Sequence, residues 1–444
     1  MSPVPTALLI AYDYPPAAAV GAQRTLRFTR YLKDFGWRAV VLTPRVQDYA
    51  GALEPEPRKQ VPAHVVTHTA RVLRPLDLGQ GLRQRWRRRR KARPRAATPG
   101  ANGSLTSGRH SWARRMIEPW FTTPDAHVGW LPAAAWTGYR LAREHDARVL
   151  YTTGPPHSAH LVGLTLKRLA KRPWVADFRD PWTRRPWLDE AVRRTRRHQV
   201  QVRLEALVVR NADKVILNTD RMRHEFASFY GDADKFVAIS NGFDPEAFPP
   251  SAGVEGAQES VWTLAHAGSL YRKRDPGPLL HAIARLREQG IVSRSSFRLH
   301  LVGSIAGEFD VPGLIDRLAL GDLVQLTPSL SHSDCLQVLA RAQALLIIQP
   351  GTDLQVPSKL FEYIYLGRAI LALAPPGATA DIVLEHNLGI VADPESETGI
   401  ADGLSRMLRE WKSFQADAPA RARYDGRVLT GELARVFAGL AGDP

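Results

Sequence analysis

The chain has 444 residues, enough for two or three domains, and 44% of them are hydrophobic, as in ordinary globular proteins. Lysine and arginine outnumber aspartate and glutamate by 60 to 44, which gives a formal net charge of +16. The single cysteine, Cys335, excludes an internal disulfide and a cysteine-cluster metal site. No apolar run approaches the ~18 residues of a membrane span. We therefore expect a cytoplasmic protein.

The beginning of the chain predicts a βαβ unit. An apolar segment at 7–11, interpreted as a strand rather than a signal peptide, precedes a proline-rich loop, a helix at 25–35 and a strand at 39–42. Gly21 lies in that loop, where a glycine permits close approach of the backbone to a ligand at the helix start. A lone glycine is not a dinucleotide-binding fingerprint, and a simple turn residue is the alternative.

A strongly basic segment interrupts this pattern at about 80–111. Nine of the thirteen residues from Arg83 to Arg95 are basic. Blocks of like charge repel one another and rarely fold, so we predict a mobile insertion here. Three interpretations stay open: a solvated loop without a partner, attraction to anionic lipid headgroups, and nucleic-acid binding. The last is the least favoured, because no nucleic-acid motif accompanies the charge.

The pattern resumes with a strand at 148–152, a helix at 161–170 and a strand at 174–177. His157 and Asp180 each follow the carboxyl end of a strand, where open α/β sheets bind ligands. For Asp180, a turn or helix-capping role before the next proline is an equal alternative. No histidine pair has metal-ligand spacing with further ligands, so we expect no protein-bound metal.

A long helix is predicted over Glu190–Arg210, with arginines along it that form either a solvated face or a membrane-facing one. A strand at 213–218 follows, and the turn residues Asn241–Pro245 suit an interdomain linker. A second series then begins near 263. It comprises a strand, a helix, and two further strands, one of which ends at Gly303.

Two successive α/β halves predict two facing doubly wound parallel-sheet domains with a cleft between them. We place the first domain at 1–240 and the second at 241–420. Residues 421–444 are expected to form a C-terminal helix that packs back on the first domain.

The most informative stretch lies between two buried strands predicted at 344–348 and 369–373. Ser358 is predicted to cap a helix whose first-turn amides, together with Lys359, form an anion site. Glu362 follows on the same helix face, where a carboxylate can accept two hydrogen bonds from a vicinal diol such as ribose. A capping box, in which Glu362 only stabilises the helix start, is an equal alternative.

Several short motifs occur in a specific order along nearly the whole chain outside the basic insertion. They are Tyr14-Pro15-Pro16 with Gly21 and Arg24, Gly154–His160, Asp177–Trp182, Asn241–Asp244, Gly268–Tyr271 with Arg274, and Pro357–Tyr363. In order and spacing these motifs resemble those of family 4-type glycosyltransferases, which have the two-domain GT-B fold.

The resemblance implies that the donor is a nucleotide-diphosphate sugar held mainly by the second half. Glu362 would bind the ribose, while Lys359 and the amides from Ser358 to Leu360 would bind the diphosphate. Arg274 would stabilise the charge on the departing phosphate. The resemblance also implies retention of anomeric configuration, with neither a metal ion nor a cofactor.

The remaining candidate contacts belong to the donor and to a hydroxyl acceptor. Gly21 and Gly303 would lie close to the donor, His157 would contact the sugar or the acceptor hydroxyl, and Arg24 and Asp180 are sugar or acceptor candidates. In relatives the acceptor is often a lipid-linked glycan or another precursor of a surface polysaccharide. Because the positive charge is concentrated in the first half, we also predict reversible binding to the inner face of a membrane. A basic segment without a lipid partner is the alternative.

Two positions depart from the family pattern. Leu354 stands where the broader family has a second glutamate facing the transferred sugar, and Ser269 stands where the first cation of the phosphate-binding pair is common. The sugar therefore stays open. A nucleotide-sugar epimerase of the same fold is an alternative, although it would need paired carboxylates that the sequence does not reveal. A non-catalytic basic binding protein is another, which the intact Ser358–Glu362 motif argues against.

Overall fold

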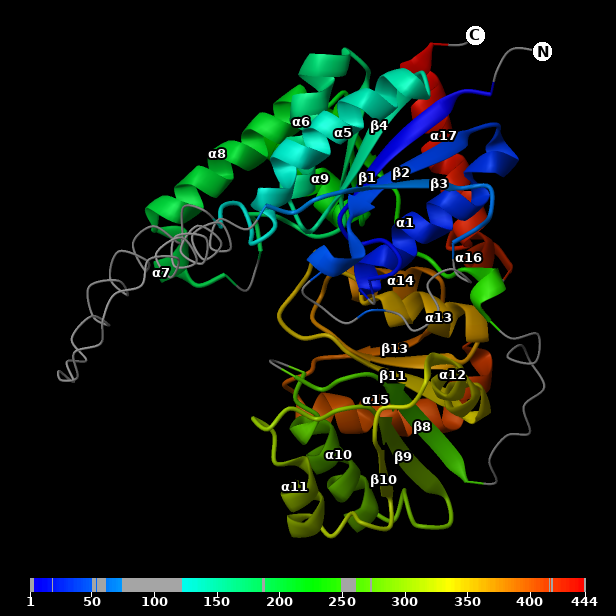
Figure 1. Ribbon diagram of the computed structural model, residues 1–444. Coiled ribbons are helices and arrows are strands. Elements are labelled where there is room, and N and C mark those ends of the chain that lie inside the picture. The colour runs from blue at the N-terminus through cyan, green and yellow to red at the C-terminus, as the bar shows by residue number, and fades with distance from the viewer. Residues whose placement is uncertain are drawn as a thin grey trace, which may run out of the picture. The chain divides into compact units, whose positions relative to one another are not determined.

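The computed structural model describes residues 4–17, 19–49, 53, 61–73, 122–185, 188–248, 261–271, 274–414, 416 and 418–442. The predicted basic insertion lies outside these residues. The chain divides into two compact units, one made of 1–216 with 434–444 and the other of 217–433 (Figure 1). Within the described part of the chain, no helix is both long and apolar enough to cross a membrane.

The first sheet has seven strands in the order β3-β2-β1-β4-β5-β6-β7. They are β1 (Thr6–Ala11), β2 (Arg38–Pro44), β3 (Val66–Ala70), β4 (Ala147–Gly154), β5 (Trp174–Phe178), β6 (Lys214–Leu217) and β7 (Phe236–Ala238). β1 pairs in parallel with both β2 and β4, and every one of its residues is buried. The predicted apolar run therefore corresponds to a central strand that is covered on both faces.

The helices between these strands differ from prediction at three places, one of which is the helix predicted at 161–170, which begins at Ser158. The helices are α1 (Val20–Tyr31), α5 (Leu131–Glu144), α6 (Ser158–Ala170), α7 (Glu190–Arg193), α8 (Arg196–Asn211) and α9 (Asp220–Tyr230). α1 begins five residues before the predicted start, at Val20. The predicted helix over 190–210 is two helices, because the side chain of Thr195 accepts a hydrogen bond from the His198 amide and starts α8 anew.

The second sheet has six strands in the order β10-β9-β8-β11-β12-β13. They are β8 (Trp262–Ala267), β9 (Phe297–Val302), β10 (Val324–Thr327), β11 (Ala344–Ile348), β12 (Ala369–Leu373) and β13 (Gly389–Ala392). β11 and β12 coincide with the strands predicted at 344–348 and 369–373, and they pair in parallel. Two parallel-sheet α/β domains are thus confirmed.

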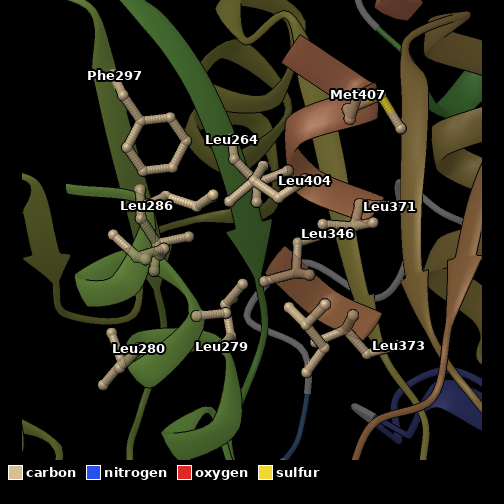
Figure 2. Close-up of a cluster of buried hydrophobic side chains, with 14 of the residues drawn as sticks. Leu264, Leu279, Leu280, Leu286, Phe297, Leu346, Leu371, Leu373, Leu404 and Met407 are labelled. Carbon is tan, nitrogen blue, oxygen red and sulfur yellow. The ribbon is translucent and has the colours of Figure 1, made fainter. Parts of the chain in front are cut away.

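Helices cover both faces of this second sheet. They are α10 (Gly277–Glu288), α11 (Val311–Arg317), α12 (His332–Arg341), α13 (Ser358–Leu366), α14 (Ala378–Glu385), α15 (Glu397–Glu410) and α16 (Ala418–Arg423), and a last helix, α17 (Gly426–Ala441), follows them in the chain. Leu346 of β11 packs in one apolar cluster with Leu404 and Met407 of α15, as Figure 2 shows. The neighbouring Leu345 belongs to a second cluster, which α12 and α13 complete. The alternation of side chains along a strand thus fixes α13 against the sheet.

The final helix, α17, carries a buried phenylalanine that belongs to the first unit. The ring centroid of Phe437 lies 5.4 Å from that of Trp37 and 6.1 Å from that of Tyr151, in both cases edge to face. Offset and edge-on contacts of this kind between aromatic rings are favourable beyond the area they bury. The first unit therefore contains side chains from both ends of the described chain.

Candidate functional site

In the second unit, the site is built around the amino end of α13. The cap residue is Pro357, in an extended conformation, and no side chain caps the helix. The predicted Ser358 cap is therefore wrong, because Ser358 is already the first helical residue. The capping-box alternative fails with it, since Glu362 lies beyond the third helical position, where a capping-box carboxylate has to stand.

Lys359 is held at the carboxyl end of β8. Its Nζ donates a hydrogen bond to the Ala267 carbonyl oxygen at 2.8 Å and lies 3.4 Å from Nε2 of His266. Gly268 follows with φ +140°, and a Cβ at this glycine would collide with Nζ of Lys359. Glycine at this position therefore permits the positive φ and also leaves room for the ammonium group of Lys359.

His266 gives this ammonium a neutral neighbour. The ring is buried, and its Nδ1 lies 2.8 Å from the Leu346 carbonyl oxygen. Nδ1 therefore carries the proton, and Nε2 presents a lone pair to Lys359. Burial and the nearby charge of Lys359 lower the pKa of His266 to about 3. Burial, followed by the charge of Arg274, lowers the pKa of Lys359 to about 8.

Arg274 and Gly303 lie at the same edge of the sheet. Nη2 of Arg274 donates to Oε1 of the buried Gln349 at 3.0 Å, just after β11. Gly303, directly after β9, has φ +140°, and a Cβ there would collide with the carbonyl oxygen of Gly268. The structure thus brings together three predicted residues, Arg274, Lys359 and Gly303, at the carboxyl ends of neighbouring parallel strands. Sequence reasoning missed His266 and Gln349.

Glu362 points from α13 toward α12. Its Oε1 lies 3.2 Å from Nε2 of His332, and its side chain is 32% exposed. Leu360, predicted as an amide donor, has a buried side chain, and its amide already donates to the Pro357 carbonyl oxygen at 3.0 Å. Leu354 is buried as well, and its carbonyl oxygen accepts the hydroxyl of Thr219 at 2.8 Å.

In the first unit, His157 is buried in the loop after β4. Its ring is 3% exposed and stacks on Trp182, with 4.7 Å between centroids and 3° between planes. Neither ring nitrogen has a hydrogen-bond partner among the described residues. Burial, with a smaller contribution from His160, holds the pKa of His157 well below its usual range. The ring is therefore neutral, with one nitrogen a donor and the other an acceptor, and both nitrogens are enclosed by protein.

Arg24 is bound to a buried carboxylate. Its Nε and Nη2 donate to the two oxygens of Asp177 at 2.9 and 3.0 Å, and the pair is 2% and 0% exposed. The hydroxyls of Tyr151 and Thr153 also donate to Asp177, at 2.5 and 3.0 Å. Burial alone would raise the pKa of Asp177, but Arg24 and these hydrogen bonds bring it below its usual value.

Gly21 approaches the side chain of Arg179, the residue that precedes Asp180 in the chain. Gly21 belongs to the first turn of α1, and a Cβ there would collide with the guanidinium of Arg179. Nη2 of Arg179 also contacts the Pro155 carbonyl oxygen and lies 3.3 Å from the Asp13 carboxylate. Asp180 follows Arg179 in the loop after β5 and is half-buried. These residues and His157 gather at the carboxyl ends of β4 and β5.

Two family models match adjoining parts of the chain. The model described as Glycosyltransferase Family 4 matches residues 88–247, and the one described as Glycosyl transferases group 1 matches 250–425. Curated relatives include the D-inositol 3-phosphate glycosyltransferases of Thermobifida fusca, 27% identical over 47% of this chain, and of Nocardiopsis dassonvillei, 27% identical over 50%. The chain spans about half the length of these relatives, 50% and 54% respectively.

Solved structures of the same fold align along almost all of the chain. Anabaena HepE in complex with UDP has a TM-score of 0.66 at 16% identity, with 98% of this chain and 100% of that one covered. WaaG, a glycosyltransferase involved in lipopolysaccharide biosynthesis, has a TM-score of 0.56 at 16% identity and the same coverage. Because the two family models together span most of residues 88–425, the chain belongs to the family 4-type glycosyltransferases and has the GT-B fold.

Proposed function

We propose that the chain is a glycosyltransferase that moves a sugar from a nucleotide-diphosphate sugar to a hydroxyl acceptor. The observation that carries this proposal is the half-buried ammonium of Lys359 in the first turn of α13, held at the carboxyl end of β8 and near enough to Arg274 for that charge to lower its pKa. A helix amino end with two adjacent cations favours a dianion such as a diphosphate. HepE has been solved with UDP and with UDP-glucose, which supports a donor of this class.

The proposed mechanism follows from where charge develops. Breaking the sugar–phosphate bond leaves negative charge on the diphosphate, and fixed positive groups there stabilise the transition state more than the ground state. Lys359 and Arg274 are these groups. His157 is the candidate contact to a hydroxyl of the sugar or the acceptor, and because both of its ring nitrogens are buried, that contact requires the loop after β4 to rearrange. Family membership supports retention of configuration, without a metal ion or cofactor, as part of the same proposal.

A panel of nucleotide sugars tests the proposal directly. Donor hydrolysis or transfer to a hydroxyl identifies a transferase, interconversion of two nucleotide sugars identifies an epimerase, and binding without turnover identifies a binding protein. Two acceptor classes enter the panel. The first is a lipid-linked glycan, suggested by the positive charge in the first half of the chain and by the role of WaaG in lipopolysaccharide biosynthesis. The second is a phosphorylated polyol, suggested by the curated relatives, whose names specify D-inositol 3-phosphate.

Replacing Glu362 with glutamine is expected to weaken nucleoside-diphosphate binding by roughly 10- to 150-fold. The carboxylate would lose its charge-assisted hydrogen bonds to the ribose diol, worth about 1.5–3 kcal/mol. Calorimetric titration with UDP measures the change, and Glu288→Gln on the exposed end of α10 is the matched control. Unchanged affinity in a folded Glu362→Gln protein would remove the ribose assignment.

We also propose that the protein binds reversibly to anionic membranes. α7 and α8 expose a basic cluster at Arg193, Arg194, Arg196 and Arg197, in the same half of the chain as the Arg83–Arg95 run. Each basic residue near an anionic surface contributes about 1 kcal/mol, and salt screens this attraction. The location is thus proposed as cytoplasmic, at the inner face of the membrane.

Co-sedimentation with vesicles measures this binding. The protein is expected to sediment with vesicles that contain phosphatidylserine, to stay in solution with pure phosphatidylcholine, and to be released by ~0.5 M salt. A variant with serine at the nine basic positions of Arg83–Arg95 keeps the chain length and is expected to lose most of the binding. Equal sedimentation with both kinds of vesicle would contradict the proposal.

A further inference from the structure

One histidine that the proposed reaction does not use touches the carboxylate assigned to the ribose. His332 is the first residue of α12, and its Nε2 lies 3.2 Å from Oε1 of Glu362 in α13. The hydroxyl of Ser331 accepts a hydrogen bond from the Asp334 amide and so caps α12. The histidine therefore projects from the fixed first turn of a helix.

The two helices that carry this pair are both anchored in the same core. Leu336 and Leu339 of α12 pack in one buried cluster with Leu360 and Ile364 of α13. His332 itself is 58% exposed and Glu362 is 32% exposed, so a ligand can reach the pair from solvent. The geometry is thus that of an accessible carboxylate held from one side by an imidazole on a rigid neighbour.

A carboxylate that clamps a vicinal diol needs a fixed orientation. Glutamate has three side-chain torsions, and fixing such a side chain on binding costs about 0.5–1.5 kcal/mol. The N–H of His332 takes one lone pair of Oε1. The second lone pair of Oε1 and the whole of Oε2 stay available to two hydroxyl groups. Part of the free-energy cost of fixing the Glu362 side chain is therefore already offset in the unliganded protein.

We propose that His332 is a positioning residue for the donor, which holds Glu362 in the orientation that receives both ribose hydroxyls. This inference rests on the proposed function, because it presupposes that Glu362 binds a ribose. A positioning role for His332 differs from a purely structural role in one measurable respect. Loss of His332 should affect ligands that carry the diol and spare ligands that lack it.

The pair also responds to pH. The hydrogen bond to Glu362 raises the pKa of His332, against the opposing effect of burial. Other titratable groups that act on this neighbourhood are Lys359 and Tyr363 of α13 and Asp334 and Cys335 of α12. Below the pKa of His332 the contact is a salt bridge, and above it a hydrogen bond from a neutral imidazole to the carboxylate. The hold on Glu362 therefore weakens as the pH rises through that value.

The test compares UDP with its 2′,3′-dideoxy analogue by calorimetric titration of the full chain. The measured quantity is the Kd of the dideoxy analogue divided by the Kd of UDP. This ratio isolates the contribution of the diol, because both ligands carry the same base and diphosphate. His332→Ala is expected to lower this ratio by about 2- to 13-fold, mainly through weaker UDP binding. His332→Gln retains a neutral N–H donor, so it should restore the ratio near pH 8 while removing its rise at lower pH.

Each result decides the matter. An unchanged or increased ratio in His332→Ala, with wild-type preference for UDP intact, overturns the positioning role and leaves the donor site standing. A wild-type protein that binds UDP without preference over the dideoxy analogue overturns the assignment of Glu362, and this inference with it. If the wild-type protein binds none of UDP, GDP or ADP, the proposed function itself fails.

Discussion

Removing the charge of Lys359, by the substitution Lys359→Gln, is expected to lower kcat for sugar transfer by about 10²–10³-fold. Loss of one preorganised group at a developing negative charge has this effect in enzymes, about 3–4 kcal/mol of activation free energy. The ammonium is fixed in advance by the Ala267 carbonyl oxygen and by the neutral ring of His266. Little reorganisation is therefore required when the diphosphate departs.

Arg274→Gln should have a loss of similar size, because Gln349 holds this guanidinium at the same edge of the sheet. Lys412→Gln, which removes an exposed charge after α15, is the matched control and should stay within a few-fold of wild type. A pH profile adds a second readout. Since the pKa of Lys359 is about 8, wild-type kcat/KM should fall as the pH rises through that value. Near-normal turnover in both variants would contradict the phosphate assignment.

Replacing Asp177 with asparagine is expected to reduce the free energy of unfolding by about 3–5 kcal/mol, because it leaves the guanidinium of Arg24 buried without a counter-charge. For a unit of this size the corresponding fall in Tm is roughly 6–20 °C. Thermal unfolding followed by circular dichroism measures it. Glu190→Gln breaks the exposed pair with Arg194 and should cost less than about 1 kcal/mol.

The same pair has a pH signature. The pKa of Asp177 in the folded protein lies below its unfolded value of about 3.9, so its contribution to stability is present above about pH 4. That contribution is lost as the pH falls through the folded value. Asp177→Asn should therefore differ from wild type at neutral pH and approach it in acid. Equal Tm values at neutral pH would contradict the prediction.

Local features of the fold could be predicted from the sequence where the pattern of apolar residues, or the type of one residue, determines them. The apolar runs 344–348 and 369–373 are strands with the predicted bounds, because a buried parallel strand requires a short continuous apolar run. The helix end near Ser358 was misplaced by one residue. The cap preference of serine side chains pointed to Ser358, but Pro357 takes the extended conformation that a cap residue needs.

The contacts that give the site its character could not be predicted, because they join residues far apart in the chain. His332 meets Glu362 across 30 residues, His266 meets Lys359 across 93, and Arg24 meets Asp177 across 153. No periodic pattern in the sequence indicates contacts between residues separated so far along the chain. Trp182 entered the sequence analysis only as the end of the motif Asp177–Trp182, whereas in the structure its indole stacks on the ring of His157. Only the packing of the strands decides which partner each polar side chain finds.

The contact of Phe437 with Trp37 and Tyr151 has a consequence for the order in which a ribosome can complete the protein. The second unit, 217–433, is synthesised in full before residues 434–444 of the first unit exist. At the usual rate of elongation, roughly 10–40 s separate residue 216 from residue 434. During that interval the first unit lacks Phe437, and the aromatic site beside Trp37 and Tyr151 is unfilled.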